Sequence, residues 1–242
     1  MTRNQTQFEF YSGLANLDIS ETMKNGRYPI QEEAEKLIVP DVMRKLAPRP
    51  DDVLLDIGFG SGTILVPFSY MVKEAVGIDN ANAVSNLSKA IDRPNIRLVT
   101  GAFPDVSLPE MEFSLVTVYS VLHALPNREA VLSFIRAAAK LLAPGGRILF
   151  GDIPNADLKM RFQASAAGEA FEEEWRKRIA RLSEDQLIKP PEIADPAPFD
   201  DAFAAEILLT LRGIGLDAYL MAQDPNLPFG NTREDIVATK RL

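Results

Sequence analysis

The sequence of 242 residues contains no cysteine and a single histidine, His123. Without cysteine there is no disulfide, no thiolate metal site and no cysteine nucleophile. One histidine excludes a centre built from several histidines, and we expect no metal site. Basic residues are also few, because 26 Lys and Arg against 34 Asp and Glu give a formal net charge of −8. A nucleic-acid surface needs clustered Lys and Arg, so nucleic acid is not expected as a partner.

Long apolar stretches are missing as well. The longest stretch without a charged residue, 57–72, contains glycine, serine and proline, and it is shorter than the roughly 18–20 apolar residues of a membrane span. The N-terminal residues MTRNQTQFEF have no apolar signal core. We therefore expect a cytoplasmic protein without a membrane partner.

The residues that are present suit one α/β domain. Hydrophobic residues make up 46% of the chain, which is enough for a core. Residues 1–50 are predicted to be a helical lead-in that Pro40 kinks or splits. From residue 51, β-branched apolar runs alternate with amphipathic stretches, which is typical of a doubly wound, mostly parallel sheet. The predicted strands are 53–58, 75–79, 96–100, 113–120 and 147–152.

The second half of the chain begins with a clear helix and then loses the alternation. That helix is predicted to start at the N-cap Asn127 and to end before Pro144-Gly145-Gly146. Residues 155–198 are predicted to be a helical insertion. Two strands, 216–222 and 233–240, are expected after a helix that Gly213 ends in the left-handed conformation. One face of the insertion helix carries apolar side chains, for which core packing is favoured over lining a pocket: Phe171, Trp175, Ile179 and Leu182.

A glycine-rich loop follows the first predicted strand. Its G-x-G-x-G spacing, with Gly58, Gly60 and Gly62, differs from the G-x-G-x-x-G of dinucleotide-binding sites. Asp56 precedes the loop and would repel a pyrophosphate but suit a cationic ligand. Asp79 ends the second strand, where a carboxylate can accept hydrogen bonds from both ribose hydroxyls. The alternatives are an ordinary β–α turn for the glycines and a helix N-cap for Asp79.

Five segments between residues 51 and 152 resemble the successive motifs of class I S-adenosylmethionine-dependent methyltransferases. They are VLLDIGFGSGT, AVGIDNA, VTGAFPD, FSLVTVYSVLHAL and LLAPGGRILFGD. The resemblance implies a three-layer sandwich with a seven-stranded, mostly parallel sheet whose last strand is antiparallel. It implies a helical N-terminal lid (1–50) and a cofactor-binding domain (51–242) with the insertion at about 155–198. The implied cofactor is S-adenosylmethionine, and homodimer formation is a further expectation.

The same resemblance assigns roles to individual residues. The glycine loop would contact the methionine end of the cofactor, Asp79 the ribose and Asn80 the adenosine. The family often has an acidic residue near the adenine, but this sequence has Gly101-Ala102-Phe103 there. The expected cofactor-binding residues are Asp56, Gly58, Gly60, Ser61, Gly62, Asp79, Asn80, Ala102, Phe103, Tyr119 and Ser120.

Four further residues are candidates on the acceptor side. His123 follows the fourth strand, and an imidazole there could act as a general base; the alternative is a structural histidine at a helix start. Tyr11, Arg27 and Tyr28 lie in the lead-in, which in relatives folds over the cofactor, and we assign them to substrate binding. Their alternative is packing for the aromatic rings and solvation for Arg27.

Absent motifs narrow the acceptor. There is no Asn/Asp-Pro-Pro-aromatic motif of amino methylation and no Asp…Asp-Asn set of magnesium-dependent enzymes. The predicted function is methyl transfer to an oxygen, nitrogen or carbon atom of a small molecule such as a sugar or secondary metabolite. The alternatives are a non-catalytic S-adenosylmethionine-binding protein and a nicotinamide-dependent oxidoreductase, the latter disfavoured by the glycine spacing and by Asp56.

Overall fold

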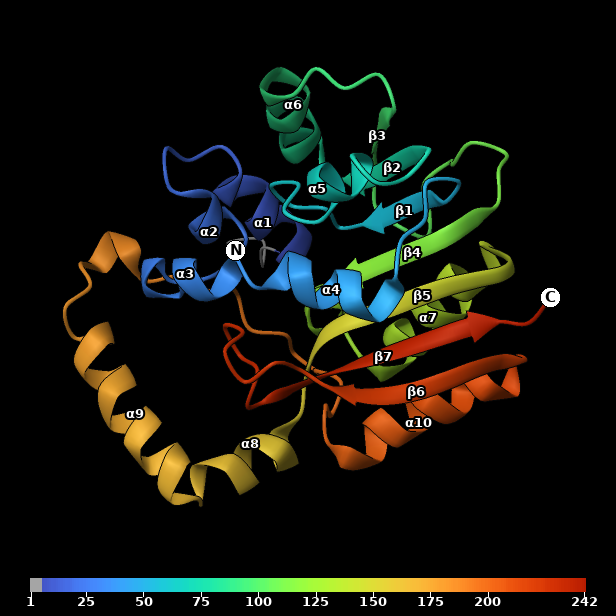
Figure 1. Ribbon diagram of the computed structural model, residues 1–242. Coiled ribbons are helices and arrows are strands. Elements are labelled where there is room, and N and C mark those ends of the chain that lie inside the picture. Colours follow the sequence, from blue (N-terminus) through green and yellow to red (C-terminus); the bar gives the residue numbers. More distant parts are fainter. Residues whose placement is uncertain (1–5) are drawn as a thin grey trace.

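The computed structural model describes residues 6–242 and is built around one seven-stranded sheet (Figure 1). The strand order is β3-β2-β1-β4-β5-β7-β6. All neighbouring strands from β3 to β5 are parallel, whereas β7 is antiparallel to both β5 and β6. The strands are β1 (Val53–Ile57), β2 (Glu74–Asp79), β3 (Ile96–Thr100), β4 (Phe113–Tyr119), β5 (Leu142–Pro154), β6 (Leu216–Ala222) and β7 (Arg233–Lys240). The predicted sheet, with its antiparallel last strand, is confirmed.

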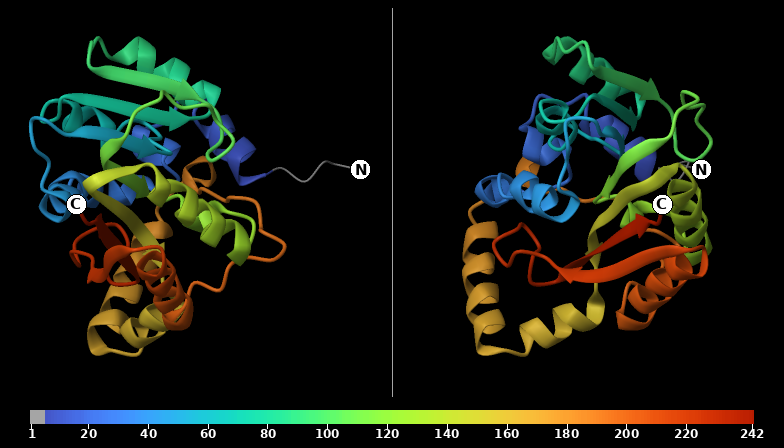
Figure 2. Two further views of the ribbon diagram at one scale, coloured as in Figure 1. Left: turned by 90° about the vertical axis from the view of Figure 1, so that its right-hand side faces the viewer. Right: turned by 45° about the vertical axis from the view of Figure 1, so that its right-hand side comes forward.

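Helices cover both faces of the sheet, which gives the predicted three layers (Figure 2). Side chains alternate between the faces along each strand, so Leu54 and Leu115 pack with one helix layer and Leu55 and Val116 with the other. The first layer contains α4 (Ile38–Leu46), α5 (Leu65–Ser69) and α6 (Ala81–Ala90). The second contains α7 (Arg128–Lys140) and α10 (Asp201–Gly213).

Two local predictions need correction. Pro144-Gly145-Gly146, predicted to separate the helix from a strand at 147–152, lies inside β5, where the pairing with β4 shifts register and Gly145 has a φ of 75°. Gly213 is the last residue of α10 rather than its left-handed cap. Gly215, with a φ of 91°, takes the left-handed conformation two residues later. The N-cap Asn127 of α7 is confirmed, and its side chain accepts a hydrogen bond from the Ala130 N–H.

Residues 6–50 of the lead-in fold as several short helices instead of one kinked helix, and residues 1–5 of the predicted lead-in lie outside the described residues. The lead-in contains α1 (Gln7–Leu14), α2 (Glu21–Lys24), a 3₁₀ turn at Pro29–Gln31 and α3 (Glu32–Glu35) before α4. The break lies at residues 36–37. Pro40 is instead in the first turn of α4, where a backbone N–H has no partner within the helix.

The insertion forms an arm of two helices, α8 (Ala156–Gln163) and α9 (Ala166–Ile179). The arm leaves the sheet at the end of β5, and the far end of α9 returns to the region of α3 (Figure 1). We predicted that its apolar face packs in a core, and that prediction is wrong. No residue of α8 is buried, and Gly168 is the only buried residue of α9. Across residues 6–242, no helix combines the length and apolar character that a membrane crossing requires.

Candidate functional site

The loop after β1 is shaped by its glycines. Gly58, Gly60 and Gly62 all have positive φ values, of 78°, 57° and 86°. A Cβ atom at Gly60 would lie 2.6 Å from the side-chain oxygen of Asn25, and one at Gly58 would lie 2.5 Å from Val121. Only glycine fits both the conformation and the space, so bare main chain lines this part of the site.

Asp79, at the end of β2, faces the same loop. One oxygen of its carboxylate accepts a hydrogen bond from the Gly60 N–H at 2.7 Å, and the other accepts bonds from Asn80. The N-cap of α6 is Asn80 and not Asp79, because the Asn80 side chain accepts from the N–H groups of Asn82 and Ala83. The helix-cap interpretation of Asp79 is therefore wrong. Burial raises the pKa of Asp79, and its hydrogen bonds with Gly60 and Asn80 oppose that rise.

Asp56 lies beneath the loop and is only 2% exposed. The Thr117 hydroxyl donates to its Oδ1 at 2.7 Å, whereas its Oδ2 is buried without a partner. Burial raises the pKa of Asp56 to about 7; the hydrogen bond from Thr117 opposes this rise, and the charge of Asp79 adds to it. A carboxylate in this state has an oxygen available to a cationic group and would be ionised by one.

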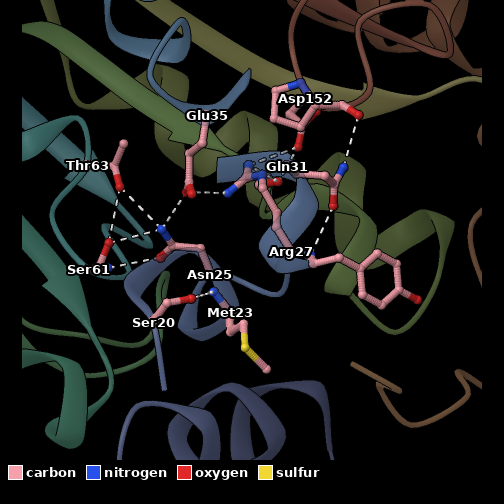
Figure 3. Close-up of polar contacts among 12 residues, drawn as sticks. Ser20, Met23, Asn25, Arg27, Gln31, Glu35, Ser61, Thr63 and Asp152 are labelled. Atoms are coloured by element: carbon pink, nitrogen blue, oxygen red, sulfur yellow. Dashed lines mark hydrogen bonds and ion pairs between the residues drawn. The ribbon is translucent and has the colours of Figure 1, made fainter. Parts of the chain in front are cut away.

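Asn25, which the sequence analysis missed, ties the N-terminal segment to the glycine loop (Figure 3). Its Oδ1 accepts from the Ser61 N–H at 3.1 Å. Its Nδ2 donates to Glu35 at 2.8 Å, to the Ser61 hydroxyl at 3.0 Å and to Thr63 at 3.2 Å. Asn25 and Glu35 lie in short, polar helix ends without periodicity, so no sequence pattern distinguished them.

Arg27 lies on the other side of Glu35 and is only 5% exposed, so the solvated alternative for it is wrong. Its Nη1 donates to Glu35 at 3.2 Å (Figure 3). Its Nη2 reaches the Ser120 hydroxyl at 3.3 Å and Asp152 at 3.5 Å. Two predicted site residues, Arg27 and Ser120, are thus brought together, and Asp152 joins them.

Asp152 is the centre of this buried cluster. Besides Arg27, its Oδ2 accepts from the Ser120 hydroxyl and from Arg233 Nη1, the latter at 2.6 Å. Burial alone would raise the pKa of Asp152, but Arg233, Arg27 and Ser120 together lower it. Ser120 and Asp152 both have left-handed backbones, with φ values of 62° and 61°. Such strain in residues other than glycine gathers at functional sites, and a dihedral angle is not visible in a sequence.

Of the two predicted tyrosines of the lead-in, Tyr11 reaches the cluster around Asp152, whereas the side chain of Tyr28 points elsewhere. The pKa of Tyr11 is raised by burial, against the charges of Arg233 and Arg27 that lower it. The ring of Tyr28 packs against Trp175 of α9, with centroids 6.0 Å apart.

His123 lies in a 3₁₀ turn, Leu122–Ala124, directly after β4. Burial lowers the pKa of its imidazole to about 3, and the charges of Arg233 and Arg27 contribute, whereas Asp152 opposes. Its Nδ1 is buried without a partner. The ring is therefore neutral at physiological pH, and its Nδ1 atom is free to form a hydrogen bond with a ligand.

The remaining predicted residues lie at the adenine end and beside β5. Gly101 N–H donates to the Asp79 carbonyl at 3.0 Å, which places the turn containing Ala102 beside the end of β2. Ala102 is exposed, and the ring of Phe103 packs edge-to-face on Phe134 with centroids 4.9 Å apart. Tyr119 is buried against Gly151 of β5.

Comparison with known proteins agrees with this architecture. Residues 55–150 match the family model described as a methyltransferase domain. Among solved structures, the N-methyltransferase NodS from Bradyrhizobium japonicum WM9, in complex with S-adenosyl-L-homocysteine, superposes with a TM-score of 0.61 at 14% identity, over 97% of this chain and 98% of that one. The methyltransferase CcbJ from Streptomyces caelestis gives 0.59 at 18% identity over 99% of both chains. Residues 55–150 are thus similar to methyltransferase domains, and the chain has the fold of these solved methyltransferases.

Curated relatives match parts of the chain. The chain is 34% identical to nocamycin O-methyltransferase from Saccharothrix syringae, over 46% of this chain and 42% of that protein. It is 29% identical to chondramide synthase cmdD from Chondromyces crocatus, over 62% of this chain and 4% of that protein. The matched part is thus less than half of either relative.

The cofactor of the class is S-adenosylmethionine, and the residues of this methyltransferase domain fit it. The molecule carries a sulfonium cation, an ammonium group and a ribose. Asp56 offers an unpartnered buried carboxylate oxygen, Asp79 offers a second carboxylate, and the three glycines of the loop offer main chain without side chains of its own. This donor set suits a cationic adenosyl compound and has no cation for a pyrophosphate.

Proposed function

We propose that this chain transfers the methyl group of S-adenosylmethionine to an oxygen atom of a small-molecule acceptor. The observation that carries the proposal is the unpartnered carboxylate oxygen of Asp56 beneath the glycine loop, opposite Asp79. The names of two relatives, nocamycin O-methyltransferase and 27-O-demethylrifamycin SV methyltransferase from Amycolatopsis mediterranei (strain S699), support oxygen over nitrogen or carbon.

The cofactor-binding residues are proposed to be those of the sequence analysis, from Asp56 to Ser120. When bound, S-adenosylmethionine supplies a methyl group that is already activated by its sulfonium. The protein then has to position the acceptor and take up one proton. Asp56 would balance positive charge of the cofactor, Asp79 would accept hydrogen bonds from the ribose, and the glycine loop would lie against the methionine end.

His123 is proposed to receive the acceptor's proton. Its Nδ1 has no partner and its ring is neutral at physiological pH. A pKa of about 3 makes it a weak base toward a free alcohol. An alcohol whose oxygen is being methylated becomes strongly acidic, however, so a weak base that is always unprotonated is adequate. Arg27 and Tyr11, at the same cluster, are proposed to orient the acceptor together with Tyr28.

The N-terminal segment is proposed to act as a lid. Support comes from Asn25, which binds the glycine loop, and from Arg27, which binds Ser120 and Asp152 beside β4 and β5. These contacts hold one segment over both the cofactor end and the acceptor end of the site. Lids of this kind exclude water and complete a site after the ligands have entered.

Calorimetric titration with S-adenosylhomocysteine and with NADH tests the cofactor assignment. We expect micromolar binding of the former and none of the latter. Asp79→Ala should abolish binding, whereas Asp217→Ala, on the exposed strand β6, should leave it unchanged. Tight binding of NADH would contradict the proposal and favour an oxidoreductase.

Methyl transfer is tested by incubation with methyl-labelled S-adenosylmethionine and a metabolite extract. A labelled product with a methyl ether is expected, and methylation of nitrogen or carbon would overturn the assignment of the attacked atom. Intact cofactor binding with no labelled product across broad extracts would favour the non-catalytic binding protein. Homodimer formation remains a prediction, for which sedimentation of the same samples is the measurement.

A further inference from the structure

The arm formed by α8 and α9 presents aromatic side chains that no core covers. Phe171 is 46% exposed, and α9 buries no side chain. A surface helix of a globular protein normally buries its apolar face against the body. The apolar face of α9 therefore lacks the partner that such a helix has, although it lies next to the proposed site.

These aromatic side chains form a continuous series, which we call the aromatic row. Neighbouring ring centroids in it are 6.0, 5.9 and 5.7 Å apart. The two central rings, on successive turns of α9, are nearly parallel with an interplanar angle of 15°. In order, the row consists of Tyr28, Trp175, Phe171 and Phe162. It thus joins the lead-in to both helices of the arm.

The row begins in the N-terminal segment that is proposed as the lid. Its first member, Tyr28, directly follows Arg27, whose guanidinium contacts Ser120 and Asp152. The arm is held in place at both ends. Arg161 of α8 pairs with Asp201 at 2.6 Å, and Arg178 of α9 donates to the Ile30 carbonyl at 2.5 Å. Figures 1 and 2 show the arm reaching from the end of β5 back toward the lead-in helices.

The charged side chains of α9 make polar contacts of their own, and one of them, Arg178, bonds to the Ile30 carbonyl two residues after Tyr28. Lys177 and Glu173 pair with each other at 2.7 Å and are both more than half exposed. The row itself contains no ionisable group except the Tyr28 phenol. Aromatic rings without charges favour an apolar or aromatic occupant over a polar one such as a bare sugar.

We infer that the acceptor carries an apolar or aromatic extension, which packs along the aromatic row while its hydroxyl group lies near His123 and Arg27. This inference rests on the proposed function and names the acceptor class for the same site. An elongated acceptor is implied, because the row extends over four rings.

The inference can be tested without knowing the acceptor, because Trp175 is the only tryptophan in the chain. Its fluorescence is recorded while the protein, saturated with S-adenosylhomocysteine, is titrated with hexyl β-D-glucoside and with methyl β-D-glucoside. These probes share a sugar and differ in apolar length. We expect a saturable shift of the emission, with a midpoint about tenfold lower or more for the hexyl probe.

Variants show whether the row is responsible. Phe171→Ala should raise the hexyl midpoint about threefold or more, since one face of the packing is lost. Tyr219→Ala, which removes an exposed ring on β6, should leave the midpoint unchanged. If circular dichroism shows that Phe171→Ala unfolds α9, Phe162→Ala takes its place.

Equal midpoints for the two probes, or no shift at all, would overturn the inference if S-adenosylhomocysteine still binds. An emission that changes with protein concentration alone would also overturn it, because a second copy of the chain would then cover the row. Failure to bind S-adenosylhomocysteine contradicts the proposed function instead, so the two failures are distinguishable.

Discussion

The carboxyl group of Asp56 is buried, has one oxygen without a partner and has a pKa raised to about 7. Near neutral pH the free protein therefore holds it as a mixture of neutral and ionised forms. A cationic cofactor binds the ionised form. Cofactor affinity should be fully present above pH 7 and should fall as the pH drops below it, by about tenfold per pH unit at the limit, because binding must then release a proton.

This prediction is checked by titrating S-adenosylmethionine calorimetrically between about pH 5.5 and pH 8 in buffers of different ionisation enthalpy, which also count the released protons. Asp56→Asn should bind more weakly at pH 8 and lose most of the pH dependence. The remaining slope would come from Asp79, whose pKa is also raised. A wild-type affinity that is constant over this range would contradict the role of Asp56.

For His123 we expect the opposite of Asp56, namely no pH dependence near neutral pH. Its lowered pKa, about 3, keeps the imidazole neutral throughout the range in which an ordinary histidine titrates. At saturating cofactor and acceptor, kcat should show no decline centred near pH 6.5, the usual pKa of histidine. His123→Asn should lower kcat by roughly 10²-fold or more if the ring accepts the proton.

The measurement is the pH dependence of kcat for both proteins, with Asn226→Ala, in an exposed turn, as the control variant. A decline near pH 6.5 that the Asn variant lacks would show that the ring titrates normally. An unchanged kcat in the Asn variant would remove His123 from the reaction.

At the scale of single elements, the sequence predicted strands with a regular pattern well. It predicted poorly which helix faces lack a packing partner. The strands Leu216–Ala222 and Arg233–Lys240 were predicted to the residue, because short, largely apolar runs between turn residues leave few alternatives. The apolar face of α9 was predicted to pack in a core. Periodicity shows that a helix has an apolar face and not what covers it, so only the structure reveals that Phe171 is exposed and that Trp175 is only partly buried.

The residues of the site also fall into those that the sequence could predict and those that it could not. Asp56, Asp79 and the glycines follow predicted strands, so their meeting at one edge of the sheet could be anticipated. Asn25 and Asp152 could not. Asn25 reaches Ser61 across 36 sequence positions, and Asp152 is distinguished by a left-handed backbone and by its partners Arg27 and Arg233. Such contacts depend on the folded chain and leave no local pattern.

The closed position of the N-terminal segment depends on Asn25. Asn25→Ala would remove the bonds to Ser61, Thr63 and Glu35 and leave the buried carboxylate of Glu35 with fewer partners. We expect the segment to open more often, with a free-energy loss of about 1–3 kcal/mol. Hydrogen exchange followed by mass spectrometry should therefore speed up roughly tenfold or more in residues 15–35 and stay unchanged in β4 and β5.

Ser88→Ala is the matched control, since the Ser88 hydroxyl donates only to the Ser85 carbonyl on the exposed side of α6. Unchanged exchange in residues 15–35 of Asn25→Ala would show that other contacts, such as those of Arg27 and Gln31, hold the segment. Faster exchange throughout the sheet would instead mean that Asn25 supports the whole fold.

Across the whole molecule, buried charges connect the outer helix layer with the site. Lys45 of α4 is 6% exposed and contacts Asp41 and Asp235, each at 2.6 Å. Asp235 in turn accepts from the backbone N–H of Asp152 at 2.8 Å. The left-handed backbone of Asp152 is thus supported by a charge pair between α4 and β7, so the conformation of the site and the stability of the fold depend on the same side chains.

Lys45→Met tests this connection. The variant leaves Asp235 buried without its cation, and removing one partner of a buried pair costs roughly 3–5 kcal/mol. We expect Tm to fall by roughly 10 °C, whereas Arg44→Ala, which removes an exposed partner of Asp41, should change Tm by about 2 °C or less.

The pH dependence of the fall in Tm shows whether the lost charge of Lys45 causes it. Burial already raises the pKa of Asp235, and loss of Lys45 removes the cation that lowers it. In the variant, the Asp235 carboxylate is ionised above its raised pKa, and this buried charge then destabilises the fold. Below that pKa the carboxyl group is neutral and carries no such cost. The Tm difference from wild type should therefore be largest near pH 8 and shrink toward pH 5, as measured by differential scanning calorimetry. A difference that stays constant over this range would mean that Lys45 acts through packing of its methylene chain and not through its charge.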